Sequence, residues 1–304
     1  MTSVSLTTFL SPRYWYAWPV LALMLILSWL PGFVHWLLGS ALGEILSWFP
    51  TPNRRFARRN VELCFPDASP ADRRRILKRH FRLSGYATLG LSIVWFAPQW
   101  RIRKFINLVD NHYLEDAYAS GRNVILFAPH FVGLDIGGMR TSLGRLFVSM
   151  YRKARNPLIE YLFQRRGRYG SLVVERFSSL KPVIRLIRNK WPFYYLPDQD
   201  MGERASVFVP FFGIPAATVT MLSRIAETTN AVVIPCVTRA LPFGRGFETR
   251  LYPPFENFPS EDPTADAARM NREIERWVRE MPEQYMWTYR RFKTRPNGEK
   301  SLYD

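Results

Sequence analysis

The sequence predicts an α/β fold in which helices cover both faces of a mostly parallel sheet, an αβα arrangement. From residue 123 onward, short β-prone runs alternate with segments of helical periodicity, and no linker divides residues 54–304. Apolar residues make up 47% of the 304 positions, enough for a substantial core. The strands are expected at 124–128, 146–150, 172–174, 193–196, 231–238 and 247–251. The helices are expected at 69–83, 86–96, 134–142, 157–168, 181–190, 215–229 and 262–280.

The central feature of this pattern is the turn that follows the first of these strands. The run 124–128 is uncharged and β-prone, as in a strand that is buried on both faces. Pro129 ends it, His130 follows at once, and Gly133 precedes the helix expected at 134–142. Such a turn places side chains at the carboxyl edge of the sheet, where open α/β folds have their sites.

The N-terminal segment predicts attachment to a membrane. No charged residue occurs between positions 14 and 43, and the apolar stretch 17–38 has the length of one bilayer span. A helix lying in the membrane interface and a cleaved signal peptide are the alternatives, of which the signal peptide fits least. We therefore expect a transmembrane anchor over residues 1–48, kinked at Pro31, and a catalytic domain over residues 49–304.

The net charge of +17 requires an anionic partner or surface. Residues 54–82 contain ten Arg or Lys against three acidic residues, and residues 152–190 contain eleven against two. A solvated helix face usually mixes the two signs, whereas basic clusters next to a membrane segment bind anionic headgroups. Because the basic flank follows the apolar segment, the positive-inside rule places the bulk of the chain in the cytoplasm. Cys64 and Cys236 are too few for a disulfide framework or a zinc site.

His130 and Asp135 are the first candidates for catalysis. Five positions apart, they could meet across the turn, where a carboxylate would orient the imidazole as a base that removes a proton from an alcohol. With 25 acidic residues and four histidines in the chain, such a pair also arises readily by chance. The position after an apolar strand and before a glycine-containing turn favours the functional interpretation.

Three more polar stretches fall near the same edge of the predicted sheet. The first contains Arg152 and Asn156, just past a strand. The second contains Arg166 and Arg168 at a predicted helix end, where cations can instead simply stabilise the helix dipole. The third is 197–200, in which two aspartates follow a strand; metal binding, substrate binding and a plain turn are alternatives there.

Several blocks resemble the bacterial late acyltransferases of lipid A biosynthesis, which add lauroyl, myristoyl or palmitoleoyl chains. The blocks are APHFVGLD, YRKARNP, RRGRYG, YYLPDQDMG, VFVPFFGIPAAT and PEQYMWTYRRFKTRP, and the resemblance covers nearly the whole chain. The His-x4-Asp motif alone is similar to that of the wider lysophospholipid and glycerolphosphate acyltransferase superfamily. The resemblance implies that His130, Asp135, Arg168 and Asp198 are catalytic. We assign substrate binding to Arg152, Asn156, Arg166 and Asp200.

The resemblance also implies the reaction and the partners. A fatty acyl chain would pass from acyl carrier protein to the hydroxyl of a 3-hydroxyacyl chain on the Kdo-bearing lipid A precursor, at the cytoplasmic side of the bacterial inner membrane. His130, oriented by Asp135, would take the hydroxyl proton, and no metal or other cofactor is expected beyond the phosphopantetheine thioester. The alternatives are an acyltransferase for another lipid acceptor and a non-enzymatic anion-binding protein. We expect no nucleic-acid partner, because no recognisable motif accompanies the charge.

Overall fold

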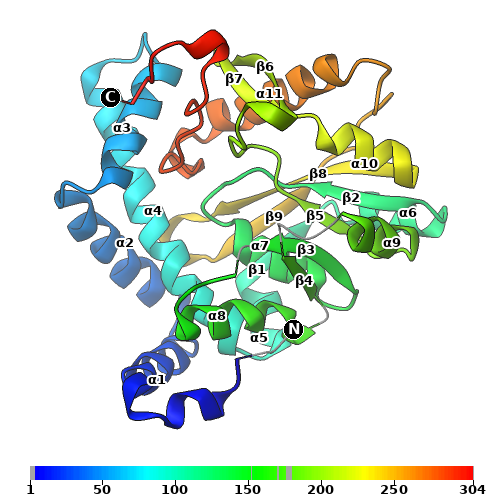
Figure 1. Cartoon of the computed structure of the whole chain (residues 1–304). Helices are drawn as coiled ribbons and strands as arrows, with labels where there is room; N and C mark the ends of the chain where they lie inside the picture. The colour runs from blue at the N-terminus through cyan, green and yellow to red at the C-terminus, as the bar shows by residue number, and fades with distance from the viewer. Residues whose placement is uncertain (1–3, 152, 170, 176–179, 304) are drawn as a thin grey trace.

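The computed structural model describes residues 4–303 except 152, 170 and 176–179 (Figure 1). The strands are β1 (Ile106–Val109), β2 (Asn123–Phe127), β3 (Phe147–Tyr151), β4 (Ser171–Glu175), β5 (Phe193–Tyr195), β6 (Ser206–Phe211), β7 (Ile214–Val219), β8 (Ala231–Ala240) and β9 (Phe247–Leu251). The α-helices are α1 (Ala17–Leu27), α2 (Gly32–Trp48), α3 (Pro52–Cys64), α4 (Pro70–Phe96), α5 (Gln99–Phe105), α6 (His112–Ala119), α7 (Leu134–Ser142), α8 (Pro157–Gln164), α9 (Lys181–Arg188), α10 (Met221–Thr229) and α11 (Pro263–Glu280).

A seven-stranded sheet in the order β1-β9-β8-β2-β5-β3-β4 forms the centre of the molecule. β2 is parallel to both of its neighbours, with Ile125 level with Phe193 of β5 and with Val233 of β8. β9 is antiparallel to β8 and parallel to β1, so β1 and β9 run opposite to the other five strands. The ends of β2 and β5 therefore lie side by side at one edge of the sheet.

Helices cover both faces of this sheet, as predicted. Along β2, Ile125 and Phe127 pack in one cluster with α9, α10 and α11, whereas Val124 and Leu126 pack in another with α6 and the start of α7. Side chains alternate between the two faces of a strand, so these clusters are the two cores of an αβα sandwich. The α/β architecture is confirmed, and every strand expected between 124 and 251 is present.

Two elements after the N-terminal segment differ from the prediction. The helix expected over 215–229 is a strand followed by a helix, β7 and α10. β7 pairs with β6 in a hairpin closed by Phe212 and Gly213, both with positive φ (50° and 76°), which suits a tight two-residue turn. The helices expected at 69–83 and 86–96 form one continuous helix, α4.

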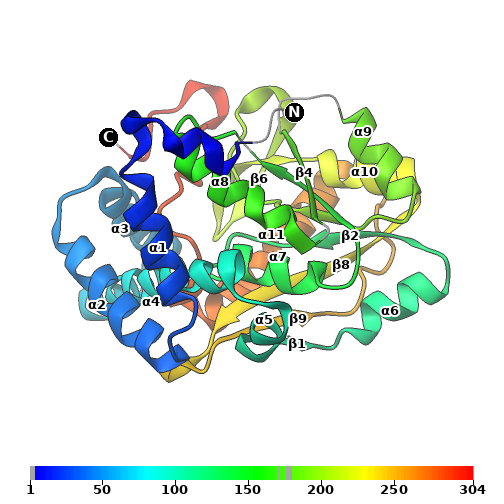
Figure 2. The same cartoon turned by 90° about the horizontal axis from the view of Figure 1, so that it is seen from below.

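The predicted single N-terminal helix over 17–38 is wrong. α1 ends at Leu27, α2 begins at Gly32, and the chain turns between them, with Pro31 at the N-cap of α2 (Figure 2). Pro31 therefore marks a complete break rather than the expected kink. Across the part of the chain that the structure describes, no helix combines the length and the apolarity needed to cross a bilayer. The division of the chain at residue 48 stays a prediction.

α2 and α4 cross in very close contact because glycines meet at their interface. A Cβ atom added at Gly43 would overlap the backbone carbonyl oxygen of Phe81, and one added at Gly39 would come within 2.5 Å of the Tyr86 Cα. On the facing helix, a Cβ at Gly85 would overlap the carbonyl oxygen of Gly39. The obstructing atoms belong to helix backbone, which cannot move aside, so the position of α2 depends on these glycines.

Replacing Gly43 by Ala should therefore destabilise the protein although alanine favours helices. The methyl group must separate α2 from α4, which we expect to lower the free energy of unfolding by about 2 kcal/mol. Thermal or denaturant unfolding measures this loss. Gly167→Ala is the matched control, because an added Cβ there meets no atom within 4 Å. Equal stability of the Gly43→Ala and Gly167→Ala proteins would contradict the close packing.

Candidate active site

His130 lies at the carboxyl end of β2, in the turn that connects β2 to α7. The Ala128 amide continues the pairing of β2 by donating to the carbonyl of Tyr195 at 2.9 Å, after which Pro129 ends the ladder. The chain then turns through Gly133 into α7, as predicted. His130 is 4% exposed, so its ring is enclosed by protein rather than presented on the surface.

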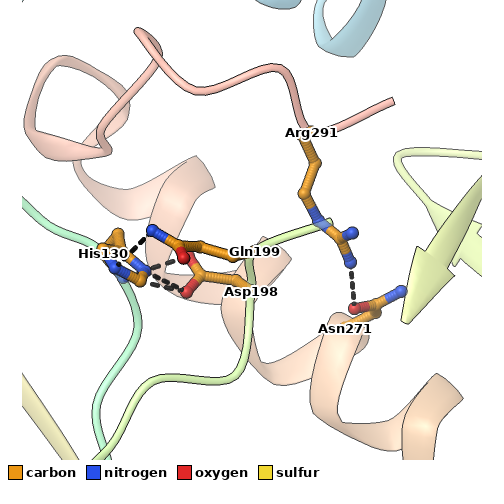
Figure 3. Close-up of polar contacts among 5 residues, drawn as sticks. All are labelled: His130, Asp198, Gln199, Asn271 and Arg291. Atoms are coloured by element: carbon orange, nitrogen blue, oxygen red, sulfur yellow. Dashed lines mark hydrogen bonds and ion pairs between the residues drawn. The ribbon is translucent and has the colours of Figure 1, made fainter. Parts of the chain in front are cut away.

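The partner of the imidazole is Asp198, which follows β5 (Figure 3). Nδ1 of His130 lies 2.6 Å from Oδ1 of Asp198, and the backbone amide of His130 donates to both carboxylate oxygens, at 3.2 and 3.0 Å. The contact arises because β2 and β5 are parallel neighbours whose carboxyl ends meet at one edge. Both side chains are buried, at 5% and 1% exposure.

Asp198 is held as an anion in this buried position. Burial acts to raise its pKa, but the charge of His130, its two kinds of hydrogen bond and the charge of Arg291 outweigh burial, so the pKa lies below its usual 3.8. Because folding lowers the pKa of Asp198, its ionised carboxylate stabilises the folded protein at pH values above the usual pKa of the group. That contribution is lost only as the pH falls through the lowered value.

Arg291 is itself buried and fixed behind Asp198. Its guanidinium donates to the carbonyl of Ala217 at 2.8 Å, to Oγ1 of Thr218 at 3.0 Å and to Oδ1 of Asn271 at 2.9 Å (Figure 3). Tyr285 makes a side-chain hydrogen bond with Asp198, and burial followed by the charge of that aspartate raises the pKa of the phenol well above its usual value. The carboxylate is thus surrounded by preplaced polar groups.

This arrangement leaves Nε2 of His130 as the basic atom. With Nδ1–H donating to an ionised carboxylate, the neutral ring carries its lone pair on Nε2. The amide nitrogen of Gln199 lies 3.2 Å from Nε2, in position to donate to that lone pair. The half-buried Gln199 side chain therefore occupies the place from which a substrate hydroxyl would be deprotonated.

The C-terminal segment completes the site. The amide of Met286 donates to the carbonyl of His130 at 2.8 Å, and the amide of Val132 donates to the carbonyl of Gln284 at 2.8 Å. The ring of Tyr289 meets the imidazole edge to face, with centroids 5.0 Å apart. Residues more than 150 positions away in sequence thus fix the backbone on both sides of His130.

The predicted contact between His130 and Asp135 is not formed. Asp135 lies in the first turn of α7, where its side chain is 40% exposed and forms an ion pair with Arg166 at 2.7 Å. The carboxylate of Asp135 pairs with Arg166, and the buried imidazole has Asp198 as its partner instead. His130 and Asp198, and separately Asp135 and Arg166, are the pairs that the structure brings together.

The other predicted residues of the arginine stretch support the end of α4. Arg168 donates to the carbonyl of Ala97 and stacks on Tyr169, and Arg165 donates to the carbonyl of Trp95 at 2.6 Å. Burial lowers the pKa of Arg168 from its usual value. These contacts fit the helix-end alternative, although the helix is α4 rather than α8, and a catalytic role for Arg168 stays a prediction.

The remaining candidates have local partners or lie outside the described residues. Asn156 caps α8 by accepting from the amide of Leu158 at 2.9 Å. Asp200 accepts from the amide and hydroxyl of Thr294, at 2.6 and 2.7 Å, so it faces a different partner from Asp198. Arg152 is not among the described residues. Substrate binding by these three residues and by Arg166 stays a prediction.

Two hollows are lined by sequence neighbours of the pair, one by Gln199 and the other by Val132. One, of about 240 Å³, is lined by apolar side chains such as Met150 and Val219 and by Gln199. The other is a cleft of about 670 Å³ between the end of α2, α4 and the turn after His130. Its walls are mostly apolar, including Phe49 and Met286, and Asp135 lies in its lining. Mostly apolar hollows next to a buried polar pair are typical of sites for apolar ligands.

Sequence reasoning missed Gln199, Tyr285 and Arg291 as parts of the site. All three lie in blocks that carry the family resemblance, PDQD and QYMWTYRR. For Arg291, the available signal in the sequence was an arginine without a nearby acidic residue. Its burial and its contact with the site are set by tertiary structure alone.

The tautomer of His130 can be tested directly, because the chain has only four histidines. In the ¹⁵N spectrum of histidine-labelled protein, we expect the neutral ring of His130 to carry its proton on Nδ1 and to leave Nε2 unprotonated. Asp198→Asn should change this signal, because the carboxylate that accepts the Nδ1 proton is lost. Asp135→Asn is the control and should leave it in place. A signal that responds to Asp135→Asn and not to Asp198→Asn would contradict the geometry.

Comparison with known proteins assigns the chain to a family. Residues 4–294 match the family described as bacterial lipid A biosynthesis acyltransferase. The lipid A biosynthesis lauroyltransferase of Escherichia coli is 35% identical over 98% of this chain and 97% of that protein. The palmitoleoyltransferase of E. coli is 34% identical over 97% and 96%. Among solved structures, the 1-acyl-sn-glycerophosphate acyltransferase of Thermotoga maritima aligns with 68% of this chain and 83% of that chain, at 14% identity and a TM-score of 0.37. The extent of the family match shows that the chain belongs to the bacterial lipid A biosynthesis acyltransferases.

Proposed function

We propose that the protein transfers a fatty acyl chain from acyl carrier protein to the hydroxyl of a 3-hydroxyacyl chain on the Kdo-bearing lipid A precursor. Membership of the family makes it an acyltransferase of lipid A biosynthesis. The observation that carries the finer proposal is the buried His130–Asp198 pair, whose neighbours Gln199 and Val132 each line an apolar hollow. Such a base suits the deprotonation of an aliphatic alcohol away from water.

The proposed mechanism assigns the first proton transfer to His130. Asp198 keeps the Nδ1 proton on the ring and stabilises the imidazolium that forms when Nε2 takes the proton of the acceptor hydroxyl. The alkoxide oxygen attacks the thioester carbonyl carbon, and a tetrahedral oxyanion forms. Collapse of this intermediate breaks the carbon–sulfur bond, and the imidazolium returns its proton to the phosphopantetheine thiolate. The products are the acylated glycolipid and the free carrier protein.

The two hollows suit the two substrates. The apolar hollow would receive the donor chain, because it is lined by Gln199, whose side-chain amide lies 3.2 Å from Nε2 of His130. The larger cleft would receive the acceptor chain, because it passes Asp135 and opens beside the exposed Phe49. Gln199 must leave Nε2 when the acceptor hydroxyl arrives, and its amide is then available to a developing negative charge.

An acyltransferase for another lipid acceptor, such as a lysophospholipid, is the alternative. It would use the same base, and it differs from the first proposal only in the headgroup that accompanies the hydroxyl. The surplus of positive charge over residues 54–82 and 152–190 favours an acceptor with several anionic groups and an acidic carrier protein.

The proposal predicts that His130→Ala lowers turnover at least roughly a hundredfold while the protein stays folded, because the general base is lost. Purified protein would be incubated with acyl carrier protein thioester and the Kdo-bearing precursor, and the products identified by mass spectrometry. His112→Ala, on the exposed face of α6, is the control. Turnover of the His130→Ala protein within a factor of two of wild type would exclude this base. Turnover on a lysophospholipid alone would favour the alternative.

We also propose that the protein acts at the cytoplasmic side of the bacterial inner membrane, with α1 and α2 lying in the interface. Both helices expose large apolar side chains, among them Ile26 and Phe33, each 61% exposed, and Trp48, 69% exposed. Aromatic residues and adjoining arginines are typical of segments at the boundary between acyl chains and headgroups. This is the interfacial arrangement that the sequence left open.

Ile26→Ser with Phe33→Ser should weaken binding to vesicles that contain anionic phospholipid by at least about tenfold. The reason is that two side chains no longer insert into the apolar layer. Vesicle flotation or sedimentation measures the bound fraction. Leu146→Ser with Leu172→Ser is the matched control, because these residues are 50% and 43% exposed near β3 and β4. Equal losses in the two double variants would contradict insertion by α1 and α2.

A further inference from the structure

A basic hollow lies between the end of α2, α3 and the start of α4. It has a volume of about 660 Å³, and five cationic side chains line it against two carboxylates, those of Glu44 and Glu62. The cationic residues are Arg54, Arg58, Arg73, Arg74 and Lys78. The two carboxylates are already paired, Glu44 with Lys78 at 2.8 Å and Glu62 with Arg58 at 2.8 Å. Positive charge therefore remains uncompensated in the hollow.

Arg54, Arg73 and Arg74 carry this excess, and the guanidinium of Arg73 already donates to the carbonyl of Pro66. Within the described part of the chain, Arg54 and Arg74 form no ion pair, and both are exposed toward solvent. Structural arginines elsewhere in the protein behave differently: Arg165, Arg166 and Arg291 each have a carbonyl, a carboxylate or an amide oxygen as partner. A pair of unpaired guanidinium groups in one hollow is a suitable receptor for a phosphate group.

The basic hollow adjoins the cleft that is lined by Val132 and Asp135. Phe81 lines both of them. A third depression, of about 410 Å³, contains Thr51, which also lines the cleft, and Arg54, which also lines the basic hollow. A single ligand can therefore extend from Asp135, past Phe81, to the arginines without leaving the surface.

The spacing along α4 indicates the size of such a ligand. Lys78 lines the basic hollow and Thr88 lines the cleft together with Asp135. Ten residues of α-helix separate them, about 15 Å at the helical rise. In a glycerolphosphate acceptor the reacting hydroxyl lies close to the phosphate, so that phosphate could not reach the arginines. A phosphorylated sugar headgroup of more than one ring can bridge the distance.

We propose that Arg54 and Arg74 bind a phosphate group of the acceptor's sugar headgroup while the acceptor chain lies in the adjoining cleft. This inference rests on the proposed acyl transfer to a glycolipid and adds the site that selects its headgroup. Binding of the far phosphate positions the sugar so that the hydroxyl near the other end meets Nε2 of His130. The arginines hold the acceptor and take no part in the proton transfer.

The test compares the double variant Arg54→Gln/Arg74→Gln with the wild-type protein. Both are assayed in neutral detergent micelles, which contain no anionic lipid. Two acceptors are used, the phosphorylated precursor and the same glycolipid after phosphatase treatment. We expect the double variant to raise KM for the phosphorylated acceptor at least about tenfold, with kcat and the KM for the carrier-protein thioester unchanged. For the dephosphorylated acceptor, wild type and variant should have equal KM values.

Arg122→Gln with Arg272→Gln is the matched control, because it removes two exposed cations from other parts of the surface. An equal rise of KM in the control, or an equal rise for both acceptors, would overturn the proposal. A rise of KM for the carrier-protein thioester alone would assign the hollow to that partner. A loss of vesicle binding with unchanged KM in micelles would assign it to membrane lipids. Wild-type turnover on the phosphorylated acceptor tests the proposed function separately, because the proposed function predicts this turnover whether or not the two arginines bind the phosphate.

Discussion

The short contact between His130 and Asp198 is the interaction on which the site depends. It requires β2 and β5 to be parallel neighbours, since only then do the turns after the two strands meet. It also requires an anion inside the protein, which is costly unless paired. The charge and hydrogen bonds of His130 and the charge of Arg291 compensate for that cost. The sheet order and the buried polar groups thus serve the same contact.

The cleft in front of this pair depends on a different constraint, the close approach of α2 to α4. Gly39 and Gly43 let α2 lie directly against the backbone of α4, and α4 forms one wall of the cleft. α2 carries exposed apolar residues on its other side and ends beside the basic hollow. One helix therefore combines three features: exposed apolar side chains, a wall of the cleft and an edge of the basic hollow.

Much of the fold was predictable because its signals are local. The uncharged run of β2, the proline that ends it and the helix after Gly133 can be read from adjacent residues, and all are present. The hairpin of β6 and β7 was missed because Ile214–Val219 is a strand only through its partner. The same limit applies to the site. Asp135 is near His130 in sequence, whereas Asp198 is 68 residues away and becomes its partner only through the sheet. Similarly, the break at Pro31 accompanies the close packing of α2 against α4, which the hydrophobic periodicity of the sequence does not indicate.

The return of the C-terminal segment to the turn after β2 has a consequence for cleavage of the polypeptide. Met286 and Gln284 fix the backbone around His130, and the charge of Arg291 favours the ionised form of Asp198, although all three lie far from that pair in sequence. A polypeptide that lost residues 282–294 would therefore keep the strands of its sheet but lose the backbone hydrogen bonds that hold His130 in place.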